Sequence, residues 1–177
     1  MGFVLFYGNK VIYSNFYPAK FKIDGKVFAT SEHYSMYAKA MKFEPNAPVT
    51  YGALVSASAA KAKKSVRQVQ FFSESSWCEV KQQIMYTTCL AKLPQNSELK
   101  QLLETDDGVI VECSPHNRKW GIGMDKNNPD VQNTNQWREK NLLAETLMRI
   151  RANIREKLSQ IKLAELNVRL ESCYCED

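Results

Sequence analysis

The sequence has few of the side chains that bind metal ions tightly. It holds two histidines, and its five cysteines form no Cys-x-x-Cys pair. Zinc sites in proteins cluster several such side chains, so we expect no metal site and no bound cofactor. The odd number of cysteines and the lack of a secretory signal predict reduced thiols in the cytoplasm. No apolar run approaches the ~20 residues that span a bilayer, so we expect no membrane contact.

Charge of one sign is not in large excess. Lys and Arg number 24 against 19 Asp and Glu, which gives a formal charge of +5 and permits an anionic ligand without requiring one. A run of like charges is commonly the solvated face of a helix, and it is also typical of a phosphate or nucleic-acid patch. Both interpretations apply to the densest basic stretch, which contains Lys61, Lys63, Lys64 and Arg67. The length of 177 residues fits one compact domain.

The residue patterns predict an α+β fold, a mostly α-helical single domain with a few short strands. Asp24-Gly25 is a hairpin turn signal, and Thr30 or Ser31 is a suitable N-cap for the helix that follows. Segment 114–131 has little apolar content, and so long a loop in a compact domain is typical of function or disorder. We expect strands at 3–7, 21–28 and 109–112, and helices at 30–43, within 53–70, at 73–90, at 95–105 and from 137 to past 170. The expected inward stripe of the last helix is Leu143, Leu147, Ile150, Ile154 and Leu158.

Glu32 and Lys39 lie seven residues apart in the helix predicted at 30–43. A spacing of seven falls about 20° short of two full turns, so both side chains project from one face, about 10 Å apart along the axis. A carboxylate suits acid/base work, and an amine suits nucleophilic work on a small molecule held between them. The same spacing fits a solvated pair on a surface helix, which is the commoner arrangement of charged residues.

Three further segments carry side chains suited to a ligand. In Ser14-Asn15-Phe16, between two predicted strands, Asn15 can cap a turn or reach a ligand. Trp77 fits the core, although an indole face also stacks well on a base. The run 112–123 leaves a buried strand and ends in Trp120-Gly121-Ile122-Gly123, whose glycines allow close backbone approach to a ligand. It is not a dinucleotide fingerprint, because the six-residue glycine pattern and the βαβ context are absent.

Short motifs follow one another along the chain in a characteristic order. They are Ser14-Asn15-Phe16; Asp24-Gly25-Lys26; Thr30-Ser31-Glu32-His33-Tyr34; Lys39-Ala40; Arg67-Gln68-Val69; Trp77, Lys81 and Met85; Lys92; Leu99; Glu112; Trp120-Gly121-Ile122-Gly123; and Trp137, Asn141-Leu142, Leu147-Met148 and Arg151. No single motif is specific, and their joint order carries the information. In this order they resemble the NADAR family, also called YbiA-like, over about residues 3–155.

The resemblance implies a small α-rich domain that cleaves N-glycosidic bonds on phosphorylated ribose. Some members act on early riboflavin-pathway intermediates, and others remove ADP-ribose from guanine in nucleic acid. Lys39 takes the position of the family's helix lysine, and Glu32 that of its glutamate. We therefore expect an N-glycosidase for ADP-ribosylated guanine that works through a lysine Schiff base, with the glutamate as acid/base group. The expected partners are an ADP-ribosyl or ribosyl-phosphate ligand and ADP-ribosylated DNA.

The expected substrate site follows from the same positions. An indole face suits a ribose or a base, so Trp77 and Trp120 are expected to stack on the ligand. A planar guanidinium suits phosphate, so Arg67 and Arg118 are expected at the phosphates, although Arg67 equally fits a structural charge on a helix surface. The full set expected to bind substrate is Ser14, Asn15, Phe16, Tyr34, Arg67, Trp77, Arg118, Trp120, Gly121, Gly123 and Asn141.

The chain departs from the family pattern at Asn117, where relatives commonly carry Asp. Asparagine keeps the shape and the hydrogen bonding but lacks the negative charge. Asn117 stays with Lys39 and Glu32 among the catalytic candidates, and activity would be weak or absent if the Asp serves as a base. Beyond the family core of residues 1–155, the extension 156–177 predicts an amphipathic helix suited to a homodimer or partner contact.

Three functions from different classes fit the sequence. The leading one is a hydrolase of ADP-ribosyl or ribosyl-phosphate N-glycosides. The second is a non-catalytic reader that binds ADP-ribose or NAD-type ligands, motivated by Asn117. The third is a nucleic-acid-binding helical domain, motivated by the basic stretch 61–67. Retention of both Glu32 and Lys39 favours the hydrolase, because a reader has no need of a nucleophile.

Overall fold

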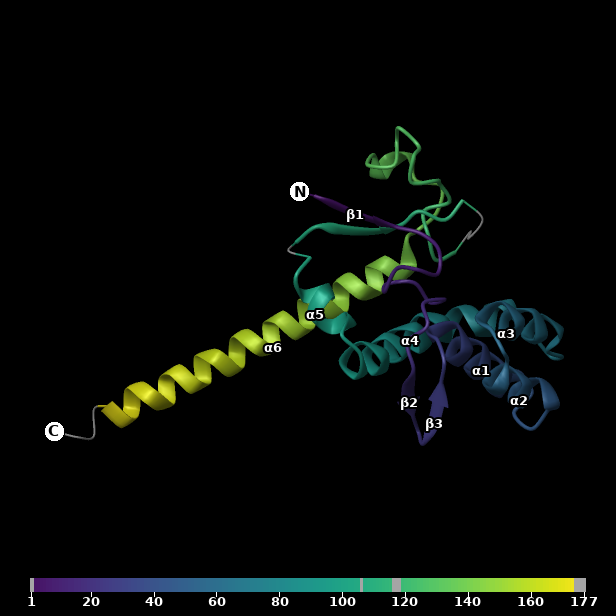
Figure 1. Ribbon diagram of the computed structural model, residues 1–177, viewed down its shortest axis with the longest axis horizontal. Coiled ribbons are helices and arrows are strands. Elements are labelled where there is room, and N and C mark those ends of the chain that lie inside the picture. Colours follow the sequence, from purple (N-terminus) through teal and green to yellow (C-terminus); the bar gives the residue numbers. More distant parts are fainter. Residues whose placement is uncertain (1, 106, 116–118, 174–177) are drawn as a thin grey trace.

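The computed structural model describes the backbone of residues 2–105, 107–115 and 119–173, with side chains described up to residue 165. It is a single, mostly helical domain with a few short strands, which confirms the predicted fold class. Helices α1 (Ser31–Phe43), α2 (Pro48–Val55), α3 (Ala59–Ser65) and α4 (Glu74–Lys92) gather at one end (Figure 1). Within the described part of the chain, no helix is both long enough and apolar enough to cross a bilayer.

Strands β1 (Phe3–Phe6) and β4 (Val109–Glu112) form a parallel pair in which Phe3 is opposite Val109 and Phe6 is opposite Glu112. In a parallel pair the carboxyl ends of both strands meet at the same edge. The Cys113 N–H extends the pairing by donating to the Phe6 carbonyl at 2.8 Å. Segments 7–9 and 113–114 therefore leave the sheet side by side and form one wall of the site.

The predicted hairpin is confirmed. Strands β2 (Phe21–Ile23) and β3 (Lys26–Phe28) pair antiparallel around Asp24 and Gly25, whose φ angles of +48° and +77° are those of a tight hairpin turn. The chain then enters α1 directly. The Thr30 side chain caps this helix by accepting a hydrogen bond from the His33 N–H, so the predicted helix start is correct to within one residue.

The helices expected within 53–70 are α2, α3 and a 3-10 turn, η1 (Val66–Gln68). Helix α2 begins at Pro48, earlier than expected, because proline fits the first helical position without losing a backbone hydrogen bond. The helix expected at 95–105 is shorter, α5 (Glu98–Leu103), and it is preceded by a second 3-10 turn, η2 (Leu93–Gln95).

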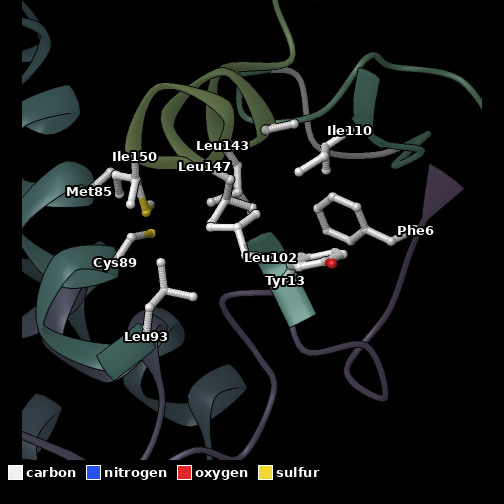
Figure 2. Packing of buried hydrophobic residues seen from close by; sticks show 11 residues of the cluster. Phe6, Tyr13, Met85, Cys89, Leu93, Leu102, Ile110, Leu143, Leu147 and Ile150 are labelled. Carbon is white, nitrogen blue, oxygen red and sulfur yellow. The ribbon is translucent and has the colours of Figure 1, made fainter. Parts of the chain in front are cut away.

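The main hydrophobic core lies between α4, α5, β1, β4 and the first half of α6 (Leu142–Cys173), as Figure 2 shows. Phe6 and Tyr13 meet edge-on in this core with ring centroids 5.8 Å apart. A smaller cluster on the other face of β4 includes Val111 and Ile122. The labelled core residues are Phe6, Tyr13, Met85, Cys89, Leu93, Leu102, Ile110, Leu143, Leu147 and Ile150.

The expectation that the last helix begins near Trp137 is wrong. The 3-10 turn η3 (Thr134–Gln136) precedes an irregular stretch, and the Arg138 and Glu139 N–H groups donate to the Ile122 carbonyl instead of starting a helix. Helix α6 begins only after Asn141, which has a left-handed φ of +55°. The expected inward stripe holds through Ile154, which is partly buried against the core, and Leu158 is exposed because α6 projects beyond the core (Figure 1).

Candidate functional site

Glu32 lies in the first turn of α1 and is buried, with 6% of its surface exposed. Its N–H donates to the Asn15 carbonyl at 2.9 Å, which ties the start of the helix to the Ser14-Asn15-Phe16 loop. Its Oε1 lies 3.5 Å from Lys63 Nζ. Burial raises the pKa of the Glu32 carboxyl, and the Lys63 ammonium opposes that shift. Glu32 is thus a buried carboxyl with one cationic partner, suited to holding or passing a proton.

Lys39 lies two turns further along α1 and is half-buried. Its Nζ is 3.9 Å from the centroid of the Phe72 ring and 5.9 Å from that of Trp77. Burial lowers the pKa of the Lys39 ammonium, because desolvation disfavours the charged form. Glu74 opposes the shift, while other cations reinforce it. Desolvation therefore favours the neutral amine that a nucleophile requires.

Lys63 connects these two groups. It pairs with Glu32, and its positive charge also contributes to lowering the pKa of Lys39. Glu32 and Lys39 therefore share one electrostatic neighbourhood, and they do not point into separate regions of bulk water. By charge pattern alone, Lys63 is one member of the basic stretch 61–67. Its helical register is informative, because it shares the face of α3 and η1 that buries Ala59, Ala62 and Val66.

A cleft of about 720 Å³ opens beside this group. Its walls are the carboxyl ends of β1 and β4, the Ser14-Asn15-Phe16 loop, and α3 with η1. Three of the predicted substrate residues line it, Ser14, Phe16 and Arg67, whereas Glu32 and Lys39 are not among the lining residues; Glu32 is joined to the cleft by its pairing with Lys63. The lining residues are Tyr7, Gly8, Asn9, Ser14, Phe16, Ala60, Lys63, Lys64, Arg67, Glu112 and Ser114.

Two sets of hydrogen bonds hold the Ser14-Asn15-Phe16 loop in place, one within the loop and one from the buried Lys92. Ser14 Oγ accepts a hydrogen bond from the Phe16 N–H at 3.1 Å. The buried Lys92 Nζ donates to the Ile12 carbonyl at 3.0 Å and lies 3.5 Å from the Ser14 carbonyl. Burial lowers the pKa of the Lys92 ammonium. Lys92 thus sets the position of the loop that carries the Asn15 carbonyl to Glu32.

The Trp120-Gly121-Ile122-Gly123 bend is fastened to the end of β4. The Ile122 N–H donates to the Glu112 carbonyl at 2.9 Å. A Cβ atom at Gly121 would lie 2.6 Å from that carbonyl oxygen, so only glycine allows this approach. Asn141 completes the attachment: its Oδ1 accepts from the Glu112 N–H at 3.0 Å, and its Nδ2 donates to the Ile110 carbonyl at 2.9 Å.

Several predicted site residues lie outside the cleft wall. Tyr34 packs against Phe28, with ring centroids 5.0 Å apart, and Trp120 packs against the main core. Gly121 and Asn141 support the cleft through the Glu112 segment, and Gly123 lies against Arg138 and Glu139; none of the three is part of the cleft lining. Asn117 and Arg118 lie outside the described residues, so the role expected of each stays a prediction.

Two features beside Lys39 were absent from the predicted site. The first is Phe72, which covers the Lys39 ammonium; the predicted residue Trp77 also lies near that ammonium, buried at the start of α4. Glu74 forms an ion pair with Lys119, and both charges influence Lys39. The described residues hold no group of three or more His, Cys, Asp or Glu side chains placed for a metal ion. The arrangement offers an amine and a carboxyl beside a basic cleft.

Comparisons with known proteins agree with this arrangement. The family model described as the NADAR domain matches residues 5–155. The chain is 35% identical to N-glycosidase R617 of Acanthamoeba polyphaga mimivirus over 79% of this chain and 85% of that protein. It is 30% identical to Protein irg-1 of Caenorhabditis elegans over 86% and 79% of the two chains. The NMR structure of the E. coli protein YbiA aligns with a TM-score of 0.70 and 28% identity, over 92% of this chain and 88% of that chain.

Proposed function

This chain belongs to the NADAR family, and on that premise we propose that it is an N-glycosidase that hydrolyses the bond between guanine and the ribose of ADP-ribose in ADP-ribosylated DNA or nucleotides. Relatives from a mimivirus and from Nostoc punctiforme are named N-glycosidases and are 35% and 32% identical to it. The observation that carries the proposal is the placement of Lys39. Its ammonium is desolvated, its pKa is lowered, and it shares Lys63 with a buried carboxyl at the edge of the cleft.

The reaction begins at the anomeric carbon of the ribose. The neutral Lys39 amine forms a bond to that carbon while the bond to guanine breaks, and the proton lost by the amine goes to the departing base. The nitrogen lone pair then forms a C=N bond as the ring C–O bond breaks, and Glu32 carries the remaining N–H proton to the ring oxygen. Water adds to this Schiff base, which releases ADP-ribose and restores the amine. The net reaction consumes one water molecule.

The cleft suits the diphosphate part of this substrate. Lys64 and Arg67 line it beside Lys63, and cations on one wall attract phosphate oxygens. A volume of about 720 Å³ is within the range of small-molecule sites. The diphosphate would lie along α3 and η1, and the ribose would reach Glu32 and Lys39 past Lys63.

The direct test is hydrolysis of an oligonucleotide carrying one ADP-ribosylated guanine by wild type and by Lys39→Ala, followed by chromatography of the freed ADP-ribose and of the unmodified strand. We expect at least about a 10³-fold loss in Lys39→Ala, because a missing nucleophile removes the covalent route. Borohydride should trap substrate on the wild type and not on the variant. Lys157→Ala, which removes an exposed lysine of α6, is the matched control. Full activity of a folded Lys39→Ala protein would refute the Schiff-base mechanism.

The same assay separates the other candidate functions. ADP-ribosylated guanine DNA, NAD and a ribosyl-phosphate pyrimidine are incubated in parallel with the wild type. Release of base only from the ribosyl-phosphate would favour a role in early riboflavin metabolism. Tight binding of ADP-ribose with no base release would favour a non-catalytic reader.

A further inference from the structure

An exposed aromatic side chain lies near Lys39, in the segment between η1 and α4. Phe71 is 80% exposed and has a φ of +55°, a left-handed backbone conformation that bulky residues rarely adopt. Such residues persist only where the surrounding structure determines them, and they concentrate at functional sites. The neighbours of Phe71 therefore indicate why its ring faces solvent.

The residues on both sides of Phe71 are anchored. The Gln70 N–H donates to the Glu44 carboxylate at 2.5 Å. On the other side, Phe72 packs edge-on against Phe43 with ring centroids 5.2 Å apart. The left-handed turn between these two anchors directs the Phe71 ring outward. The exposed ring is thus held in position by its flanks.

Cations lie over two of these rings, and Glu74, the carboxylate that acts on Lys39, is itself paired with Lys119. Lys39 Nζ lies 3.9 Å from the centroid of Phe72, and Lys42 Nζ lies 5.8 Å from that of Phe43. The nearby Glu44 carboxylate is occupied by a backbone N–H. Aromatic faces bordered by cations are typical of single-strand nucleic-acid sites, where bases stack on the rings and phosphates meet the cations.

The position of Phe71 relative to the cleft indicates which part of a substrate it would meet. Lys63 lines the cleft and forms an ion pair with Glu32. The charge of Lys63 also acts on Lys39, whose ammonium lies over the Phe72 ring. ADP-ribose in the cleft would therefore place the modified guanine near Lys39. The nucleotides that continue from that guanine would leave the site past Phe72 and reach Phe71.

We propose that Phe71 is a stacking platform for a base that flanks the modified guanine in a single-stranded polynucleotide. This inference rests on the proposed function and deepens it, because it makes a nucleic-acid strand, and not a free nucleotide, the preferred form of the substrate. The platform adds affinity for the strand outside the reacting centre. It needs an aromatic face at residue 71, and not merely an apolar one.

The test compares two substrates, a single-stranded oligonucleotide with one ADP-ribosylated guanine and the corresponding ADP-ribosylated mononucleotide. For Phe71→Leu, the ratio of kcat/KM on the strand to kcat/KM on the mononucleotide should fall about tenfold, which equals about 1.4 kcal/mol. Phe71→Trp should keep the ratio. Tyr51→Leu, which removes another exposed aromatic ring, from α2, should leave the ratio unchanged. Thermal melts establish that each variant is folded.

A second measurement decides the matter if the wild type cleaves neither substrate. Fluorescence anisotropy with an unmodified single-stranded oligonucleotide measures strand binding without chemistry. Weaker binding by Phe71→Leu, restored by Phe71→Trp, supports the platform even where the proposed activity fails. An unchanged ratio in the kinetic assay, or strand affinity equal in wild type and Phe71→Leu, overturns it.

Discussion

Replacing Lys63 with methionine tests the electrostatic link between the cleft and the buried carboxyl. At 3.5 Å and an effective dielectric constant of about 20, the attraction between Lys63 and Glu32 is about 5 kcal/mol before desolvation is counted. The Glu32 side chain is 7% exposed, whereas that of Lys63 is 40% exposed, so solvent screens much of this attraction. Breaking fully buried pairs costs about 3–5 kcal/mol, and exposed pairs contribute at most about 1 kcal/mol. We expect Lys63→Met to lower the free energy of unfolding by about 2 kcal/mol at pH 7.

The pH dependence gives this prediction its specificity. Burial already raises the pKa of Glu32, and losing Lys63 should raise that pKa further. The penalty applies only to the ionised carboxylate, so the difference between the two proteins should grow as pH rises through the raised pKa of Glu32. Because the folded pKa of Glu32 lies above the free value of about 4.3 and the unfolded states of the two proteins titrate alike, the difference should be smallest at pH 4, the acid end of the range.

The assay is urea unfolding of wild type and Lys63→Met from pH 4 to pH 8. Lys61→Met is the matched control, because Lys61 is exposed on the same helix and appears in none of the described ion pairs; its effect should stay within about 0.5 kcal/mol. A loss of stability that is independent of pH, or equal in the two variants, would refute the coupling between Lys63 and Glu32.

Two further predictions concern the bend attached to β4. Gly121→Ala should lower the free energy of unfolding by about 1–3 kcal/mol, because its Cβ would lie 2.6 Å from a backbone oxygen; Gly52→Ala in α2, where a Cβ has no atom within 4 Å, should raise it by about 0.5–1 kcal/mol. Equal thermal shifts for the two substitutions would contradict this reading. Asn141→Ala should cost about 2–4 kcal/mol, since it removes two hydrogen bonds to β4 and leaves a non-glycine residue at φ +55°. Asn141→Gly removes only the bonds and should cost less in denaturant unfolding, and the opposite order would show that backbone strain is unimportant there.

Local signals were sufficient for much of the fold. The turn at Asp24-Gly25 and the N-cap at Thr30 depend on residues within a few positions of each other, so both were predictable. The start of α6 was not, because the segment before it donates its N–H groups to Ile122, a residue distant in sequence. Leu158 is exposed although the hydrophobic period continues there, because this part of α6 projects beyond the core (Figure 1).

The sequence by itself determined that Glu32 and Lys39 share a helix face, since helical spacing depends only on local geometry. Only the tertiary structure decided what surrounds them. Lys63 from α3 and Phe72 from the segment before α4 are brought to these side chains by packing between helices. Burial, which no local pattern specifies, raises the pKa of Glu32 and lowers that of Lys39, and the proposed reaction depends on both shifts.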